Sequence, residues 1–197
     1  VLVESYPLFL PPKVSQVQKV DLDRTVLATG VDQYQKVMFA VHETGIDFYD
    51  VAMGSLIKAA AIDGLNERRI VSAYRALNNE QVGLGLEDGV VLMGRLDFQV
   101  VFEDGGTQTV TPFFIVDGLI SLFDGPVVQL AYRNDGDGRS TVLAMSEAGQ
   151  LKLGITAEKR GLLGRGKTET VVHDLTAQVT GRATSVAVAR SGRYVLA

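Results

Sequence analysis

The chain has 197 residues, of which 46% are apolar and 21% charged, so it can bury a core, and this composition excludes a disordered or low-complexity protein. It contains no cysteine, which excludes a disulfide framework, a zinc site built from thiolates and a thiol nucleophile. The net charge of −4 argues against nucleic acid as a partner, and no apolar run reaches the roughly 18 residues of a membrane-spanning helix.

A repeated pattern indicates how the chain is organised. An alternating apolar run, a short polar turn ending in glycine and a second alternating run occur at residues 37–51, 82–96 and 141–155. Alternation with period 2 is typical of strands with one buried face, and glycine supplies the positive φ of a tight turn. Each copy therefore predicts a β-hairpin.

Further strands are predicted on both sides of these hairpins. The upstream strands are at residues 24–29, 70–75 and 127–133, and the downstream strands at 55–61, 107–114 and 168–175. The chain then restarts with residues 183–189 and 193–197 around a turn at 190–192. Four antiparallel strands repeating every ~40 to 45 residues are typical of β-propeller blades.

The predicted organisation is an N-terminal arm at residues 1–20 followed by a propeller-like segment at 21–197, with blades at about 21–64, 65–120 and 121–180 and a partial blade at 181–197. The second blade is longer because residues 97–111 form an additional hairpin at its outer side. This is fewer than the ~4 to 8 blades that close a ring, so we expect open strand edges unless residues 1–10 or a second copy cover them.

A helix over residues 55–77 is the competing interpretation of the region between the first two hairpins. The segment contains Lys58, Ala59, Ala60 and Ala61, which are good helix formers. Gly64 interrupts it, and the repeat predicts strands there.

Two segments resemble WD40-type blades. Residues 184–197 are similar to the first two strands of such a blade, and residues 39–51, with their Thr-Gly turn and Phe-Tyr-Asp-Val strand end, to the second and third. The Gly-His and Trp-Asp dipeptides of the strict pattern are missing, and the chain has no tryptophan. The resemblance implies an all-β, incomplete and divergent WD40-like β-propeller of about three and a half four-stranded antiparallel blades, a fold that serves mainly as an interaction platform.

A second resemblance is to the large extracytoplasmic insertion of bacterial phosphate-type ABC transporter permeases. It is carried by the sequences PLFLPP at residues 7–12, LGLEDGVVL at 84–92, FQVVFEDG at 98–105 and VTP at 110–112. A fragment without an initial Met, a signal or membrane spans fits an excised loop domain. The resemblance implies a non-catalytic docking platform in phosphate import. It would lie on the periplasmic face of the bacterial inner membrane, and segments outside this chain would hold it next to the bilayer. Its partners would be the remainder of the permease and, as a further candidate, the solute-binding protein.

The sequence GLLGRGKT at residues 161–168 matches the phosphate-cradling loop of nucleotide-binding proteins. In such a loop Gly161 and Gly166 would allow backbone N–H groups to approach phosphates, Lys167 would reach the β and γ oxygens, and Thr168 would hold Mg²⁺. The motif requires a following helix, whereas residues 169–175 have strand character. The favoured interpretation is a glycine-rich loop between two strands of the third blade.

This loop is also the most basic one in the chain. Lys159, Arg160, Arg165 and Lys167 could contact an acidic partner or anionic lipid headgroups, although a solvated loop is the simpler interpretation.

Other candidate sites are weak. The run NDGDG at residues 134–138 has the oxygen density of a calcium loop but lacks the distal glutamate, so a plain hairpin turn is favoured. His42 and His173 have no carboxylate beside them at ligand spacing, so no metal site is expected. The apolar segment 112–126 is either buried between blades or an exposed contact surface.

We therefore expect a non-enzymatic protein with no catalytic residues, no cofactor and no metal. The first hypothesis is the extracytoplasmic permease domain. The alternative is a soluble propeller scaffold that binds proteins. A distant third is nucleotide binding at residues 161–168.

Overall fold

The computed structural model describes residues 20, 22–76, 80–102, 108–159, 167–179, 181, 183–189 and 195–197, without the side chains of Gln108, Lys159 and Lys167. The predicted arm at residues 1–20 lies outside the described residues except for its last position. Within the described ranges every regular element is a strand apart from a short 3-10 turn at Thr176–Gln178. In the same ranges no helix has the length and hydropathy to cross a membrane.

The first sheet contains β1 (Val26–Val31), β2 (Val37–His42), β3 (Gly45–Asp50) and β4 (Leu56–Ala59), in that order and all antiparallel. The next strand, β5 (Ile70–Arg75), begins the second sheet. A helix over residues 55–77 is therefore wrong. The alternating, partly buried side chains of β5 pack between sheets, and this packing outweighs the helix propensity of the alanines.

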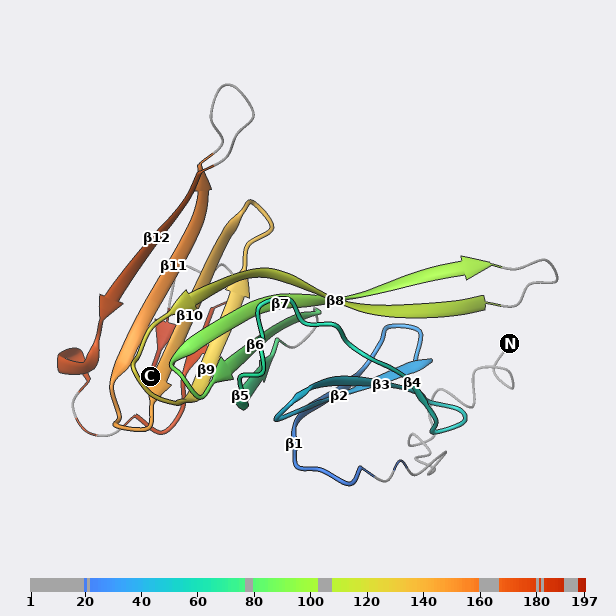
Figure 1. Cartoon of the computed structure of the whole chain (residues 1–197). Coiled ribbons are helices and arrows are strands. Elements are labelled where there is room, and N and C mark those ends of the chain that lie inside the picture. Colours follow the sequence, from blue (N-terminus) through green and yellow to red (C-terminus); the bar gives the residue numbers. More distant parts are fainter. Residues whose placement is uncertain are drawn as a thin grey trace, which may run out of the picture.

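The second sheet has the order β5-β6-β7-β8, with β6 at Gln81–Leu86, β7 at Val90–Phe102 and β8 at Gln108–Ser121. Its last two strands are more than twice as long as the other two strands of the sheet and stay paired from Val90 opposite Ser121 to Phe102 opposite Gln108. The additional hairpin predicted at residues 97–111 is therefore a continuation of β7 and β8. It projects from the body of the molecule, on the right in Figure 1.

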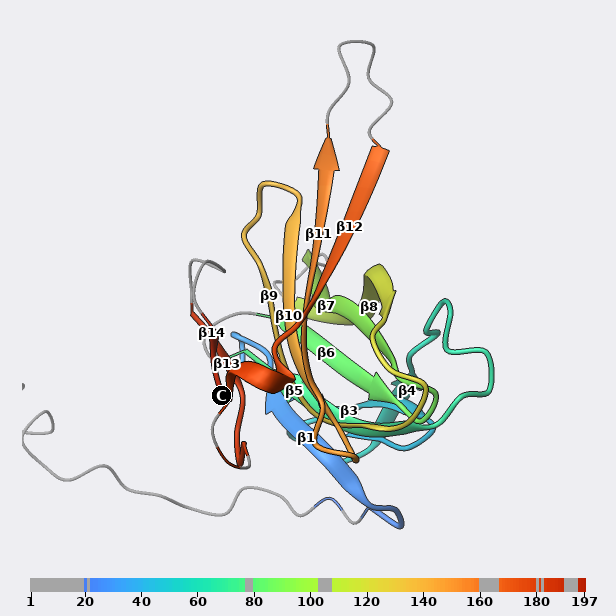
Figure 2. The same cartoon turned by 90° about the vertical axis from the view of Figure 1, so that its left-hand side faces the viewer.

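The third sheet has the order β9-β10-β11-β12 and is followed by a two-stranded sheet. Its strands are β9 (Val127–Asn134), β10 (Arg139–Ser146), β11 (Leu151–Lys159) and β12 (Lys167–Asp174). The short strands β13 (Ala187–Val188) and β14 (Val195–Leu196) pair with each other, and β13 contacts β9 and β10 (Figure 2).

The sheets are arranged as successive propeller blades. Within each four-stranded sheet the strands lie in chain order, and the first strands of neighbouring sheets lie against each other: β5 contacts β1 and β9, and β9 contacts β13. This places the first strands on the inside of a fan and β4, β8 and β12 on its outside. The predicted all-β fold, an incomplete propeller of three four-stranded antiparallel blades and two further strands, is confirmed.

Three apolar clusters lie between consecutive sheets and hold the blades together. The first joins sheets one and two through side chains such as Phe39, Phe48 and Leu84, and the second joins sheets two and three around Tyr132. The third packs β10 and β11 against the residues that lead into β13. Sheets two and three therefore use both of their faces, because the alternating side chains of their strands enter two different clusters.

The apolar segment 112–126 contributes four buried side chains to these clusters. Phe114, Ile120, Leu122 and Phe123 are each at most 8% exposed, between the second sheet and its neighbours. Burial between blades, one of the two interpretations, is therefore correct for these four side chains, whereas Leu119 is 44% exposed.

Glycine closes the central hairpin of each sheet, in two different ways. Gly89 and Gly149 have φ angles of +85° and +80°, the conformation predicted for a tight turn. At the first hairpin Gly45 also has a positive φ, but its value of +159° is close to extended backbone, and the residue is paired with His42 as the first residue of β3.

Candidate interaction clefts

Two clefts open at the same ends of the strands and share a wall made by β6 and β7. The first lies between sheets one and two and has a volume of about 400 Å³; Glu80 and Leu96 contribute to it. The second lies between sheets two and three with about 450 Å³; the adjacent residues Gln81 and Arg95 contribute to it. The side of the molecule on which both clefts open is called the cleft face below.

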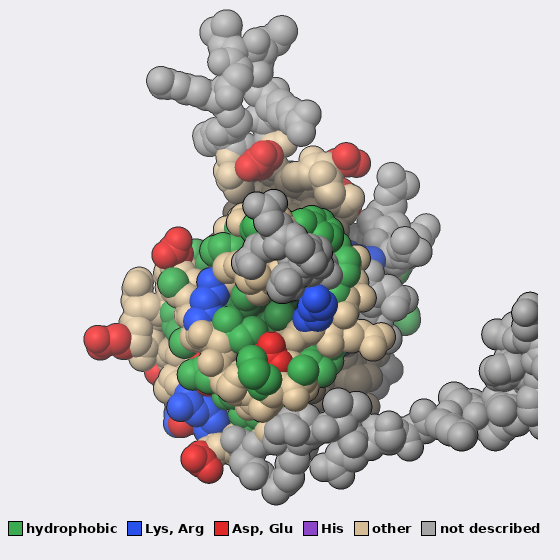
Figure 3. All heavy atoms as spheres, turned by 90° about the vertical axis from the view of Figure 1, so that its right-hand side faces the viewer, with side chains coloured by type: hydrophobic (Ala, Val, Ile, Leu, Met, Phe, Trp, Pro, Cys, Tyr) green, Lys and Arg blue, Asp and Glu red, His purple; other side chains and the backbone are tan. Residues whose placement is uncertain are grey.

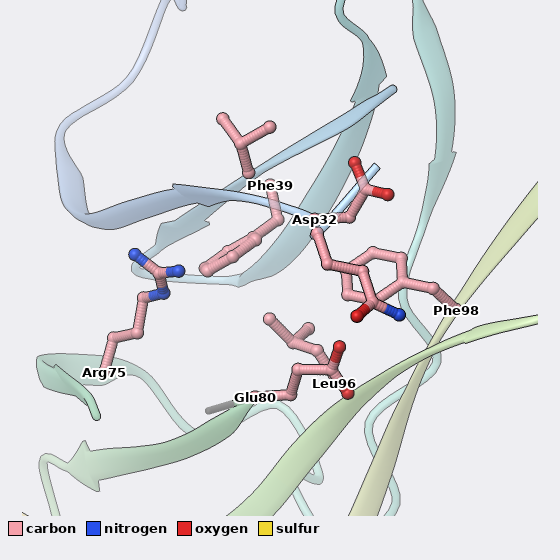
Figure 4. A pocket seen from close by; sticks show the side chains of 8 residues that line it. Asp32, Phe39, Arg75, Glu80, Leu96 and Phe98 are labelled. Atoms are coloured by element: carbon pink, nitrogen blue, oxygen red, sulfur yellow. The ribbon is translucent and has the colours of Figure 1, made fainter. Parts of the chain in front are cut away.

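The first cleft is shown in Figure 4 and combines an apolar base with charged side chains around it. The residues around it are Val31, Asp32, Gln33, Phe39, Arg75, Glu80, Leu96 and Phe98. Phe39 and Leu96 are each 1% exposed and belong to the cluster between sheets one and two. The base of the cleft is therefore a fixed part of the core.

Asp32 shapes the turn at one side of the cleft. Its carboxylate accepts backbone N–H groups from Tyr34 (3.0 Å), Lys36 (2.7 Å) and Val37 (2.8 Å), and the residue is only 5% exposed. Three donors to one buried carboxylate fix the link from β1 to β2.

Arg75 lies across the ring of Phe39 on another side of the cleft. Its guanidinium carbon is 5.5 Å from the ring centroid, a cation–π contact. Gly30, the partner of Phe39 in the β1–β2 register, makes this possible: a Cβ there would lie 2.6 Å from the Phe39 ring and 2.7 Å from the guanidinium carbon. The missing side chain lets ring and guanidinium lie against the strand.

Glu80 supplies the carboxylate that faces the interior of this cleft in Figure 4. Its backbone carbonyl accepts the N–H of Leu96 (2.8 Å), which places it beside β7. The pKa of Glu80 is raised, chiefly by burial and further by the nearby carboxylates of Asp97 and Asp32. No cation of the described chain forms an ion pair with it.

The second cleft contains a denser polar network. Arg95 forms an ion pair with one carboxylate oxygen of Asp117, and the other oxygen accepts a hydrogen bond from the hydroxyl of Tyr132 (3.3 Å). The side chain of Gln81 donates to the carbonyl of Asn134 (2.7 Å) and accepts its N–H (3.0 Å), which links sheets two and three. Burial raises the pKa of Asp117, an effect partly offset by Arg95.

A bulge places Asp117 in this cleft. Met93 is opposite Gly118 while the next residue, Gly94, is opposite Val116, so Asp117 has no partner on β7. As the extra residue of the bulge, Asp117 turns its side chain into the cleft, where the side chain is 14% exposed. Sequence reasoning missed this residue because it treated Asp117 as part of an apolar connector.

The pH dependence of the unfolding free energy tests the burial of Tyr132 in this network. Burial raises its pKa from 10.0 to about 12, so the folded state keeps a proton that the unfolded state loses near pH 10. The stabilisation is complete below pH 10 and is lost as pH rises toward 12. Relative to Tyr132→Phe, the wild type should lose about 1.4 kcal/mol of unfolding free energy between pH 9 and 11. Urea unfolding of both proteins at the two pH values measures this; a pH-independent difference would contradict it.

The projecting end of β7 and β8 rises over the first sheet. Phe98 packs edge-to-face on Phe48 of β3, with centroids 6.4 Å apart, and Lys58 of β4 lies 4.0 Å over the ring of Phe113. Beyond these anchors Val101 and Phe102 are 55% and 74% exposed. Figure 3 shows hydrophobic side chains around this hairpin with Lys and Arg side chains on both sides.

Of the residues singled out in the glycine-rich loop, Thr168 borders the second cleft. Arg160, Gly161, Arg165 and Gly166 are outside the described residues. The backbones of Lys159 and Lys167 are register partners at the ends of β11 and β12, and Thr168 is exposed opposite Glu158. The motif thus leads from one antiparallel strand into another, as favoured from the sequence, whereas a phosphate-cradling loop leads into a helix. The use of the basic residues as an interaction surface stays a prediction.

The run at residues 134–138 forms the turn between β9 and β10. The side chain of Asn134 accepts the N–H of Gly136 (2.8 Å), and Asp135 accepts those of Asp137 (2.8 Å) and Arg139 (3.1 Å). The interpretation as a hairpin turn is confirmed, because these side-chain oxygens hold backbone groups of the turn.

His42 has a carboxylate partner that its sequence neighbourhood did not reveal. Its Nε2 lies 3.2 Å from Asp47, which β3 brings back alongside β2, and its Nδ1 accepts the N–H of Thr44 (3.3 Å). Both His42 and Asp47 are buried. The pair closes the first hairpin, and no group of three or more potential metal ligands occurs in the part of the chain described.

Comparisons with known proteins give no match to any protein-family model and none to a curated protein. Among solved structures, the chain is similar to that of U3-55K (TM-score 0.43, 11% identity, 77% of this chain and 40% of that one). It is also similar to a chain of the Mitotic Checkpoint Complex, with a TM-score of 0.38 and 13% identity over 94% of this chain and 53% of that one. The similarity to the WD40 domain of SCAP from fission yeast has a TM-score of 0.33 and 11% identity over 75% of this chain and 34% of that one. The chain thus spans about a third to a half of the length of these proteins.

Proposed function

We propose that this chain is a non-catalytic interaction module that binds a protein partner on its cleft face. The observation that carries the proposal is the pair of adjacent clefts, about 400 and 450 Å³ in volume, each lined by charged side chains. Clefts of this size take up side chains or a short peptide segment. Because they share β6 and β7, one partner segment can occupy both.

Site-specific photo-crosslinking in the cells that make the protein tests which face binds. Benzoylphenylalanine is placed at Gln33, exposed at the first cleft, and in a matched variant at Gln150, exposed on the opposite ends of the strands. We expect a discrete adduct from position 33 that is at least several-fold stronger than from position 150. Equal adducts from both positions, or adducts from position 150 alone, would overturn the proposal.

A docking role in phosphate import is the second candidate, and it is supported only by the resemblance of residues 84–92, 98–105 and 110–112 to the permease insertion. The remainder of the permease would then be the partner, at the periplasmic face of the inner membrane. Gene sequence flanking the chain tests it. A membrane-spanning helix before the chain and permease helices after it are expected, and a soluble continuation on both sides would contradict it.

A further inference from the structure

We propose that the first cleft binds an arginine side chain of the partner, with its guanidinium on Glu80 and its stem against Phe39, Leu96 and Phe98. This inference rests on the proposed function and names the chemistry that the cleft recognises. Three observations carry it: the charge balance, the aromatic base and the size of the cleft.

The charge balance favours a cation. Three carboxylates, at Asp32, Glu80 and Asp97, stand in and beside the cleft against one guanidinium, Arg75. Asp32 is engaged with three backbone donors and Arg75 with the Phe39 ring. Glu80 has no ion-pair partner in the described chain, and the carboxylates of Asp32 and Asp97 repel its negative charge. A cation brought by a ligand would relieve this repulsion.

The aromatic base favours a guanidinium over an ammonium. Phe39 and Phe98 both border the cavity. Arg75 covers the Phe39 ring at 5.5 Å, so Phe98, which is partly exposed, is the ring that a ligand's guanidinium can contact. A planar guanidinium stacks on such rings and forms two parallel hydrogen bonds with one carboxylate, whereas an ammonium is more strongly hydrated and forms point contacts.

The size of the cleft fits one long side chain together with part of its backbone. About 400 Å³ is at the small end of the range for ligand pockets, which is roughly 300–1,000 Å³. The buried base formed by Phe39 and Leu96 can receive the methylene stem while the charged end stays near Glu80, at the exposed rim.

The probe is the acetylated and amidated tripeptide glycyl-arginyl-glycine, titrated into the full ¹⁵N-labelled chain and followed by amide chemical shifts. The same tripeptide with lysine, glutamine or glutamate in the centre provides the comparison. We expect weak, saturable shifts around the first cleft with the arginine peptide alone. Equal binding of the lysine or glutamine peptide, or shifts spread over the surface, would overturn the assignment.

Two variants of Glu80 and one control variant test the role of its charge. Glu80→Gln should weaken arginine-peptide binding about tenfold, the loss of one charge-assisted contact. Glu147→Gln, the same change at an exposed position near the opposite ends of the strands, should leave binding unchanged. Glu80→Lys should transfer the preference to the glutamate peptide, which a merely structural role of Glu80 would not produce. Unchanged binding by a folded Glu80→Gln protein would contradict the proposal.

The failure of this inference is distinguishable from that of the proposed function. If crosslinking from position 33 persists while the arginine peptide does not bind, the cleft face has a partner that uses other chemistry. If no crosslink forms there, the proposed function itself fails.

Discussion

Gly89→Ala should reduce the free energy of unfolding by about 3 to 4 kcal/mol, whereas Gly149→Ala should reduce it by about 1 kcal/mol. The two glycines close equivalent hairpins, with φ angles of +85° and +80°, so the backbone strain of an alanine is the same at both. Around Gly149 there is nothing within 4 Å of an added Cβ, whereas at Gly89 the Cβ would fall on the backbone carbonyl of Phe123.

The clash at Gly89 cannot be relieved by a rotamer change. The carbonyl of Gly89 accepts the N–H groups of Leu122 (3.0 Å) and Phe123 (3.2 Å), which hold the end of β8 against the turn. An alanine would push this backbone apart and break both hydrogen bonds. Urea unfolding of the two variants measures the difference, and equal losses would mean that the link after β8 adapts to the added methyl group.

Phe48→Ala is the second substitution with a large expected effect, a loss of about 3 to 5 kcal/mol. Phe48 is fully buried in the cluster that joins sheets one and two. Its removal leaves a cavity between the blades and takes away the edge-to-face partner of Phe98, which anchors the projecting hairpin over the first sheet.

The matched control is Phe102→Ala, the same substitution near the tip of that hairpin, where the side chain is 74% exposed. It should change the unfolding free energy by less than about 0.5 kcal/mol. Chemical unfolding of both variants provides the comparison. A small loss for Phe48→Ala would mean that the first two blades are not packed through this cluster.

The strands and their blade-like succession could be predicted because their signals are local. Alternation along the chain marks one face of each strand, and the glycines at positions 89 and 149 mark turns that need positive φ. The additional hairpin at residues 97–111 was predicted in the right place but as a separate unit. Its continuity with β7 and β8 depends on pairing across 13 register positions, which local alternation does not specify.

The clefts could not be predicted in the same way. Neither Glu80 nor Asp117 stands in a motif. Of the described residues of the phosphate-loop motif, Thr168 borders the second cleft. Asp117 enters the second cleft only because a bulge breaks the register between Met93 and Gly94. Whether a residue without a partner occurs in a ladder depends on both strands together.

The sequence by itself determined the all-β character, the hairpins and the number of blades, since strand alternation and turn chemistry act over a few residues. The tertiary structure alone decided how the blades meet. The hydrogen bonds between Gln81 and Asn134 join residues 53 positions apart, and Gly83 and Gly85 of β6 lie where a Cβ would strike side chains of β9 and β5. Such contacts depend on which faces two distant strands turn toward each other. The same packing produces the clefts in which we place the function.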